Sequence, residues 1–343
     1  MAPAPKVPVP PKKQNNPVVI DLNAAIVQVA DGFPQIVVVR PENSDLEIWD
    51  ALPFGPFDPF THRTMEIGLR SWVQEQTQIG LGYVEQLYTF GDRGRHALEV
   101  LEETDHIVSV GYLALTRGGE ERAGVSWRSW YQYFPWEDWR DGRPAILDKA
   151  ILPLLQDWAA DTSGSKSDEL NRGRRLDRAR LTFGLDGGAW DEENVLERYE
   201  LLYEAGLVRE ALRDGRPNAA GLEKTDAPQL GLPMQYDHRR ILATAISRLR
   251  SKLKYRPVVF ELMPDTFTLY ELQRTSEALL GLHVHKQNFR RLVEKAGLVE
   301  RTGRMSTHTG GRPAELFRFR REVFNERPAP GLRLAPSRTR ANT

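Results

Sequence analysis

Charge is distributed unevenly along this chain, and the unevenness divides it into two modules. The segment 239–343 carries 22 of the 47 Lys and Arg residues but only 9 of the 47 Asp and Glu residues. The preceding part is acidic by the same margin, so the formal net charge of zero conceals a basic module fused to an acidic one. A basic end of this kind is typical of polyanion binding, which leaves a separate task to the acidic part.

The composition excludes several classes of protein. A chain of 343 residues, 40% hydrophobic and 27% charged, is long enough for two or three globular domains. The absence of cysteine excludes disulfides, thiolate zinc sites and cysteine nucleophiles. No apolar run approaches the roughly 20 residues of a membrane helix, and the proline-rich start has no secretory pattern. We therefore expect a cytoplasmic protein that does not contact the membrane.

The acidic part has the pattern of a mixed α+β domain. Alternating and β-branched runs predict strands over 18–30, 35–40, 83–90, 107–116 and 125–134, and helical spacing predicts helices over 63–78 and 145–160. We assign 1–16 to a disordered tail, 17–160 to this domain, and 161–232 to a helical extension and linker. Within the extension we expect a loop over 161–172 and an amphipathic helix over 191–214, broken at Gly206.

The basic part has the order of elements of a winged helix-turn-helix. The pattern predicts helices over 237–255, 268–281 and 285–296, a short extended segment over 257–262, and strands over 298–302 and 314–320. A capping box at Thr268 and Glu271 begins the second helix, and Gly297 ends the third. We assign 233–324 to this domain and 325–343 to a disordered basic tail.

One face of the third helix is apolar and the other is polar and basic. Arginine reads guanine and glutamine reads adenine in the major groove, and a glycine-rich loop can approach phosphates closely. We therefore expect DNA contacts on this face and in the loop between the two strands, from Lys286, Gln287, Arg290, Arg291, Arg304 and Arg312. The alternative is a solvated basic module that packs on another protein.

Two stretches, 52–55 and 72–79, resemble a Nudix box. That box reads G-x5-E-x7-R-E-U-x-E-E-x-G-U, and its helical glutamates hold Mg²⁺ at a pyrophosphate. Gly55 matches the opening glycine, although two extra residues follow it. The positions of the arginine, the first and last helical glutamates and the closing glycine hold Ser71, Trp72, Gln76 and Gln78, and Glu75 alone is retained. We therefore expect no metal site, no catalytic residues and no hydrolysis by this mechanism.

A wider set of motifs resembles the Nudix-related transcriptional regulators of NAD metabolism. QLYTFGD follows the box, and FTLYELQ, NFRRLVEKAGLVERTG and GRPAELFRF lie in the basic part. The resemblance covers roughly 17–155 and 237–321 and is closer to the alphaproteobacterial NadQ type than to the shorter NrtR type. It implies an α+β chain with an N-terminal Nudix-like α/β/α sandwich, a helical extension and a C-terminal winged helix. It also implies a dimeric repressor that binds operator DNA near NAD-biosynthesis genes.

The same resemblance implies a nucleotide effector, such as ATP, NAD or ADP-ribose, and no required cofactor. A nucleotide needs cations for its phosphates and an aromatic face for its base. The candidates are Arg40, Tyr88, Phe90, Arg93, Arg95 and Tyr112. Aromatic side chains are more often plain core, and arginines near turns are more often solvated.

Three other functions remain open at this point. The first is a nucleotide pyrophosphohydrolase of the ADP-ribose type with an appended basic domain. The second is a DNA-binding protein that responds to no ligand, and the third is a protein–protein adaptor. A hydrolysis assay, the nucleotide dependence of DNA binding and its salt dependence separate these functions from a nucleotide-responsive repressor.

Overall fold

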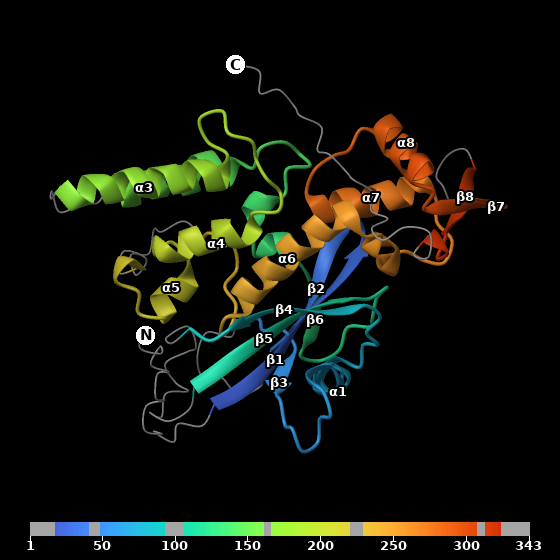
Figure 1. Ribbon diagram of the computed structural model, residues 1–343, viewed down its shortest axis with the longest axis horizontal. Coiled ribbons are helices and arrows are strands. Elements are labelled where there is room, and N and C mark those ends of the chain that lie inside the picture. Colours follow the sequence, from blue (N-terminus) through green and yellow to red (C-terminus); the bar gives the residue numbers. More distant parts are fainter. Residues whose placement is uncertain are drawn as a thin grey trace, which may run out of the picture.

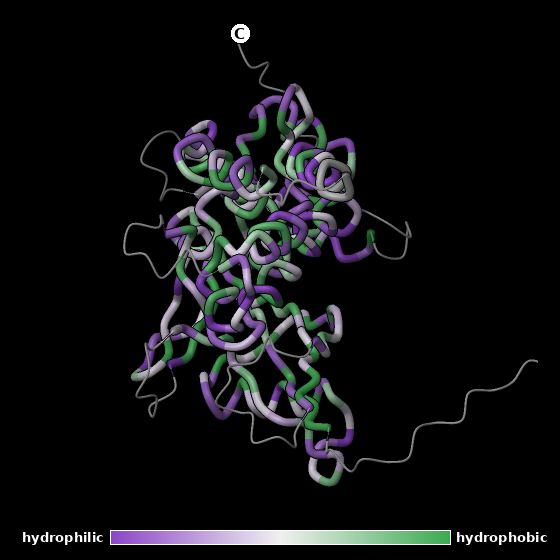
Figure 2. Tube along the Cα trace, turned by 90° about the vertical axis from the view of Figure 1, so that its left-hand side faces the viewer, coloured by the Kyte–Doolittle hydropathy of each residue, from purple (hydrophilic) through white to green (hydrophobic). Residues whose placement is uncertain are grey.

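The computed structural model of the chain describes residues 18–40, 49–92, 106–160, 166–219, 229–306 and 313–323, without the side chains of 166–171. The expected tails and the candidate residues Arg93, Arg95 and Arg312 lie outside these ranges. A mixed six-stranded sheet forms one end of the molecule, and helices and a small second sheet form the other (Figure 1). Figure 2 shows the same arrangement from the side.

The central sheet has the strand order β4-β5-β1-β2-β6, and the short β3 pairs with β1. Their bounds are β1 (Val18–Ala30), β2 (Phe33–Val39), β3 (Phe54–Pro56), β4 (Val84–Phe90), β5 (His106–Leu115) and β6 (Val125–Ser129). Only β1 and β5 pair in parallel; the other pairs are antiparallel. The β1–β2 hairpin turns at Asp31 and Gly32, both with positive φ, which is the turn that an Asp-Gly pair favours.

Helices cover both faces of this sheet, so the domain is an α/β/α sandwich (Figure 1). Leu22 of β1 packs with Leu69 of α1 (Met65–Thr77), whereas Val27, which points to the opposite face, packs with Ile241 of α6 (His238–Tyr255). Because both faces are covered, β1 reads as a nearly continuous apolar run. The sequence pattern groups α6 with the basic part of the chain, whereas the structure places this helix on the sheet. The domain boundary at residue 233 stays a prediction.

The extension is helical along most of its described length. It follows α2 (Leu152–Ala160), which a π-helical turn precedes, and it contains α3 (Lys166–Phe183), α4 (Val195–Glu204) and α5 (Arg209–Arg213). The predicted loop over 161–172 is wrong from Lys166 onward, because α3 gains its stability by burying Ala179 and Phe183 rather than from a long apolar stripe. The predicted break at Gly206 is confirmed, with φ of +72°.

Three other predicted segments differ from the structure. The strand over 125–134 ends at Ser129, because 130–132 and 135–137 form 3₁₀ turns that bury their aromatic side chains. The segment 257–262 is a 3₁₀ turn rather than extended. The segment 53–61, which its proline, glycine and phenylalanine content predicts to be a loop, contains β3, whose backbone pairs with β1.

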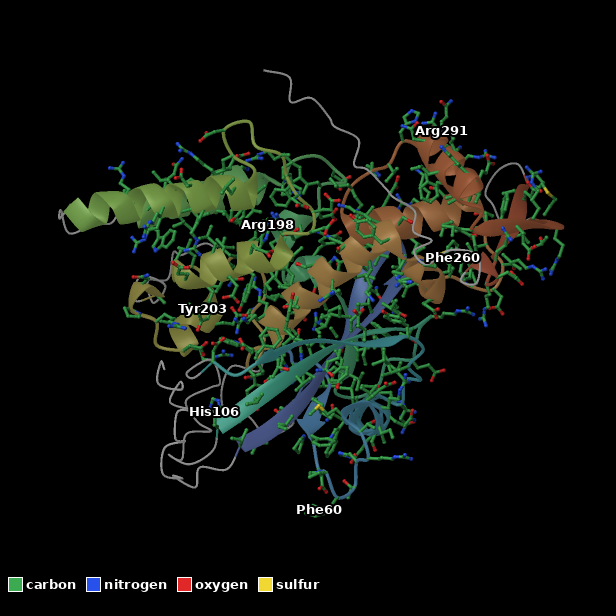
Figure 3. All side chains as sticks on the ribbon, in the orientation of Figure 1. Phe60, His106, Arg198, Tyr203, Phe260 and Arg291 are labelled. Atoms are coloured by element: carbon green, nitrogen blue, oxygen red, sulfur yellow. The ribbon has the colours of Figure 1, made fainter. Side chains whose placement is uncertain are left out.

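The winged helix is present as predicted. It consists of α7 (Leu269–Leu280), α8 (Lys286–Ala296) and the hairpin β7 (Val299–Ser306) and β8 (Ala314–Phe319). The capping box at the start of α7 is formed, and Gly281 and Gly297 end the two helices with left-handed φ of +70° and +60°. Phe260, labelled in Figure 3, stacks on Phe319 with 4.3 Å between the ring centroids. This contact belongs to the small core of the winged helix.

Within the described ranges, no helix is both long enough and apolar enough to span a membrane.

Candidate nucleic-acid interface and nucleotide site

The helix α8 presents a basic face to solvent. Its apolar side is buried through Phe289 and Val293, so the opposite face must point outward. The four predicted contacts on this face, Lys286, Gln287, Arg290 and Arg291, are all exposed. Figure 3 shows Arg291 at the outer edge of the molecule. Among the described residues, none forms a hydrogen bond or ion pair with these four side chains, which leaves them available to a ligand.

The wing adds a second exposed basic position. Arg304 is exposed and follows Gly303, whose φ of +72° lies where the β7–β8 register shifts. Arg301 and Arg318 pair instead with glutamates inside the wing. Tyr270, in the first turn of α7, is 63% exposed and was missed in the sequence. Its place inside the capping box, between Thr268 and Glu271, was the available signal, because the first helix of such motifs crosses the DNA backbone.

The C-terminus of α7 is attached to the sandwich by hydrogen bonds. The Tyr131 hydroxyl donates to the Ala278 carbonyl at 2.7 Å, and Arg250 Nε donates to the Leu279 carbonyl at 3.0 Å. The backbone N–H of Trp139 donates to the Gly281 carbonyl at 2.7 Å. The last carbonyls of a helix have no partner within it, so these donors fix α7 to the body of the molecule.

A buried ion cluster lies behind this contact. Glu137 accepts from Arg198 at 2.6 and 2.9 Å and from Arg250 at 2.7 Å, and all three side chains have no exposed surface. Figure 3 shows Arg198 in the centre of the helical part. The cluster connects the turn 135–137, α4 and α6. Sequence spacing gave no indication of it, because its members are 52 or more residues apart.

In the Nudix-like helix α1, the two positions that align with the first and last helical glutamates of the Nudix box hold β3. Trp72 Nε1 donates to the Pro56 carbonyl at 2.9 Å. The Trp72 ring occupies the space that a Cβ atom at position 55 would need, and this position is Gly55. Gln76 accepts from the Phe54 N–H at 3.2 Å and donates to the Phe54 carbonyl at 2.6 Å. The helix ends at Gln78 with φ of +56°, the conformation that the box's glycine adopts most readily.

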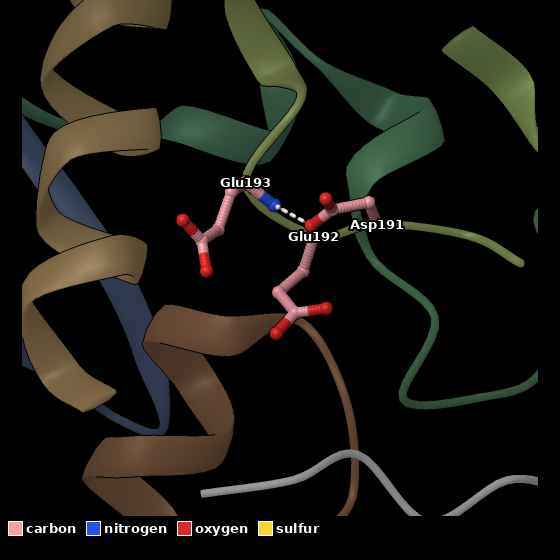
Figure 4. Close-up of side chains that lie close together, drawn as sticks. All are labelled: Asp191, Glu192 and Glu193. Atoms are coloured by element: carbon pink, nitrogen blue, oxygen red, sulfur yellow. Dashed lines mark hydrogen bonds between the residues drawn. The ribbon is translucent and has the colours of Figure 1, made fainter. Parts of the chain in front are cut away.

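The remaining acids of this helix do not converge. Glu66 pairs with Arg70 at 3.0 Å, and Glu75 is exposed. Elsewhere, among the described residues, Asp191, Glu192 and Glu193 bring three carboxylates together (Figure 4). Lys254 of α6 pairs with both glutamates, and these partners raise the pKa of its ammonium although burial opposes the shift. This acidic group therefore ties the start of α4 to α6.

The structure separates the predicted nucleotide-binding residues. Arg40 pairs with Asp50 at 2.9 Å and lies at the end of β2, with β1 and β5 between it and β4. Tyr88 and Phe90 of β4 face α6, where the guanidinium groups of two α6 arginines lie over their rings. These described candidates therefore do not line one site, and their role stays a prediction.

Tyr112 faces α1, on the opposite side of the sheet from Phe90. Its hydroxyl lies 3.4 Å from Gln86 Oε1. Burial and, to a lesser degree, the charge of Glu66 raise the pKa of the Tyr112 phenol, which therefore remains neutral and a hydrogen-bond donor at physiological pH.

Fold and site together define a class: a winged helix with an exposed basic face, docked on a Nudix-like sandwich. A family model of the NrtR DNA-binding winged helix domain matches residues 259–319. An ADPR responsive transcriptional repressor, NtrR of Acinetobacter baylyi, is 42% identical over 90 residues, which are 26% of this chain and 36% of that protein. The chain thus spans about a third of that relative's length in this match.

Two solved structures of Shewanella oneidensis NrtR share the fold. The complex with a 27mer DNA has a TM-score of 0.52 and 20% identity, and covers 89% of this chain and 95% of that one. A second structure of the same protein has a TM-score of 0.51 and 20% identity over the same shares of the two chains. In fold and domain composition the chain is therefore NrtR-like.

Proposed function

We propose that this chain is a transcriptional repressor of NAD-biosynthesis genes whose operator affinity changes when a nucleotide binds its sandwich. The observation that carries the proposal is the rigid attachment of α7 to the sandwich, because it connects an exposed DNA-reading face to a nucleotide-hydrolase fold. The Acinetobacter relative is described as ADPR responsive, and this supports ADP-ribose as the first effector to test.

We further propose that the sandwich does not hydrolyse its ligand. Trp72 and Gln76 stand where two metal-binding glutamates are needed, and both bind backbone atoms of β3. An indole and an amide cannot replace the carboxylates that Mg²⁺ prefers. Incubation of the chain with ADP-ribose and Mg²⁺ should release no AMP, and AMP formation at a steady rate would favour the pyrophosphohydrolase instead.

The proposed mechanism requires two copies of the chain. Two recognition helices of a dimer must meet half-sites about one turn of DNA apart, roughly 34 Å, so a small rotation between the copies abolishes tight binding. The effector shifts this equilibrium only by its difference in affinity for the two arrangements. The rigid attachment of α7 means that each sandwich carries its winged helix with it.

A fluorescence titration of the duplex upstream of the NAD-biosynthesis genes tests the function. A scrambled duplex is the control, salt is varied, and ATP, NAD and ADP-ribose are added in turn. Specific binding that one nucleotide alters supports the proposal. Specific binding that every nucleotide leaves unchanged indicates a constitutive DNA-binding protein, and the absence of salt-dependent binding indicates an adaptor.

Substitution of Arg290 tests the placement of the interface. Arg290→Ala should weaken operator binding by about 1–3 kcal/mol if the arginine reads a base, and the loss should be smaller on scrambled DNA. Arg172→Ala removes an equally exposed arginine from α3, outside the winged helix, and is the matched control. An equal loss on both duplexes would make Arg290 a phosphate contact, and no loss would move the interface away from α8.

A further inference from the structure

Two hydrogen-bond acceptors on β1 have no donor among the described residues. Asn23 is fully buried and its Oδ1 is unpaired, while its amide N–H donates to the backbone carbonyl of Asp21 at 3.2 Å. The carboxylate of Asp21, which is only partly buried, accepts no hydrogen bond from the described part of the chain. Natural proteins rarely leave buried polar atoms unpaired, because each costs about 1–3 kcal/mol. We call these two residues the acceptor pair.

The acceptor pair lies on the α6 face of the sheet. Side chains along a strand point alternately to its two faces, so every second residue of β1 from Asp21 onward lies on the same face. Two of these residues, Ala25 and Val27, pack in the core beneath α6. The neighbours of Asn23 across the sheet are Phe54 on β3 and Gly111 on β5. Neither side chain can donate a hydrogen bond, so the sheet itself does not satisfy Asn23.

Phe54, the neighbour of Asn23 on β3, belongs to a cluster of three aromatic rings. The centroid of the Phe54 ring lies 5.4 Å from that of Tyr236 and 5.1 Å from that of His238. The ring centroids of Tyr236 and His238 are 5.3 Å apart. Phe54 and Tyr236 are partly exposed. Tyr236 has a φ of +49°, a left-handed conformation that non-glycine residues adopt at a cost. A partly exposed aromatic surface beside unpaired acceptors fits a flat heterocycle that carries donors.

We propose that the acceptor pair and the ring of Phe54 bind the base of an adenine nucleotide, with the exocyclic amine of the base donating to Asn23 and Asp21. The inference rests on the proposed sensing function and locates it on the α6 face, opposite the Nudix-like helix α1. Adenine supplies the amine donor that both acceptors lack, and its ring supplies the flat surface that Phe54 stacks on. ATP, NAD and ADP-ribose share this base.

The position also explains how binding reaches the DNA. His238, in the first turn of α6, accepts a hydrogen bond from the Leu52 N–H at 2.9 Å and contacts the Phe54 ring. Arg250, further along the same helix, binds α7 through the Leu279 carbonyl. A ligand seated at Phe54 therefore contacts the helix that holds the winged helix in place.

Calorimetric titration with ADP-ribose and with inosine diphosphate ribose tests the site. The second ligand differs by a carbonyl in place of the exocyclic amine. The wild-type chain should bind ADP-ribose at least about tenfold more tightly, and Asn23→Leu should bind it at least about tenfold more weakly than the wild type. Gln28→Leu removes another buried amide from the same strand, one paired with Gln35, and should change the affinity less than about twofold.

The outcomes separate the site from the function. If the wild-type chain binds neither ligand, the sensing function and the site both fail. If it binds both ligands equally, or if Asn23→Leu binds ADP-ribose as tightly as the wild type, sensing survives and this site is wrong. A loss of affinity in Tyr112→Phe but not in Asn23→Leu would place the base on the α1 face. Thermal unfolding checks that Asn23→Leu is folded; we expect it to be, because Oδ1 has no partner among the described residues and only the amide hydrogen bond to the Asp21 carbonyl is lost.

Discussion

The hydroxyl of Tyr131 lies 2.7 Å from the carbonyl oxygen of Ala278, and this buried hydrogen bond joins the sandwich to the first helix of the winged helix-turn-helix. Together with the bonds from Trp139 and Arg250, it means that α7 cannot shift on the sandwich without leaving carbonyl groups unpaired. Each copy of the chain should therefore move as one body when its DNA affinity changes.

Tyr131→Phe should lower the free energy of unfolding by about 1–2 kcal/mol, because the Ala278 carbonyl loses its donor in a buried place. Urea unfolding followed by tryptophan fluorescence measures the loss. Tyr88→Phe is the matched control, since the Tyr88 side chain is 54% exposed and its change should stay within about 0.5 kcal/mol. Equal stabilities of the Tyr131 variant and the wild type would show that this bond does not hold α7.

Glu137→Gln should destabilise the chain by about 3–5 kcal/mol, because it leaves Arg198 and Arg250 buried without a counter-charge. Glu204→Gln breaks the pair with Arg178, in which both side chains are 49% exposed, and should cost less than about 1 kcal/mol. Chemical denaturation of both variants compares them. A loss below about 1 kcal/mol in the first variant would contradict the structural role of the cluster.

The stability of the chain should depend on pH through Asp21. Burial raises the pKa of this carboxyl from 3.8 to about 6 in the folded state. The folded state therefore binds the proton more tightly than the unfolded state, and stability falls as pH rises from about 4 to about 6. Asp21→Asn should be more stable than the wild type by about 1–3 kcal/mol at pH 7.5, with the gain vanishing near pH 4. A gain that is the same at both pH values would show that Asp21 has an ordinary pKa.

Gln78→Gly should raise the free energy of unfolding by about 0.5–1 kcal/mol, because glycine adopts the left-handed conformation at the end of α1 without strain. Gln74→Gly, one turn earlier on the exposed side of the same helix, should lower it by about 1 kcal/mol. The two thermal melts should therefore shift in opposite directions. Two shifts of the same sign would mean that Gln78 is not strained.

Local signals predicted most of the fold. The apolar, β-branched run of β1, the capping box at Thr268 and the glycines that end α7 and α8 each act over a few residues, so they can be read along the chain. The helix α3 was partly missed because its sequence is rich in arginine, and its stability comes from Ala179 and Phe183 docking on distant elements. Local patterns carry no information about such docking.

The candidate sites were predictable to different degrees. The basic face of α8 follows from helical periodicity alone, and the structure shows it exposed. The nucleotide candidates were chosen by residue type, and the structure places Phe90 and Tyr112 on opposite faces of the sheet. The acceptor pair and the Glu137 cluster are defined by burial and by contacts across the chain, which no spacing in the sequence reveals.

Because α6 is long, a small rotation about one end produces a larger displacement at the other end. Arg250 lies 12 residues beyond His238 on this helix, which is a lever arm of about 18 Å. A tilt of about 5° pivoting at His238 would displace Arg250 by about 1.5 Å. The 3.0 Å hydrogen bond between Arg250 and the Leu279 carbonyl does not tolerate such a displacement, so α6 and α7 have to move together, and a ligand that tilts α6 carries the winged helix with it.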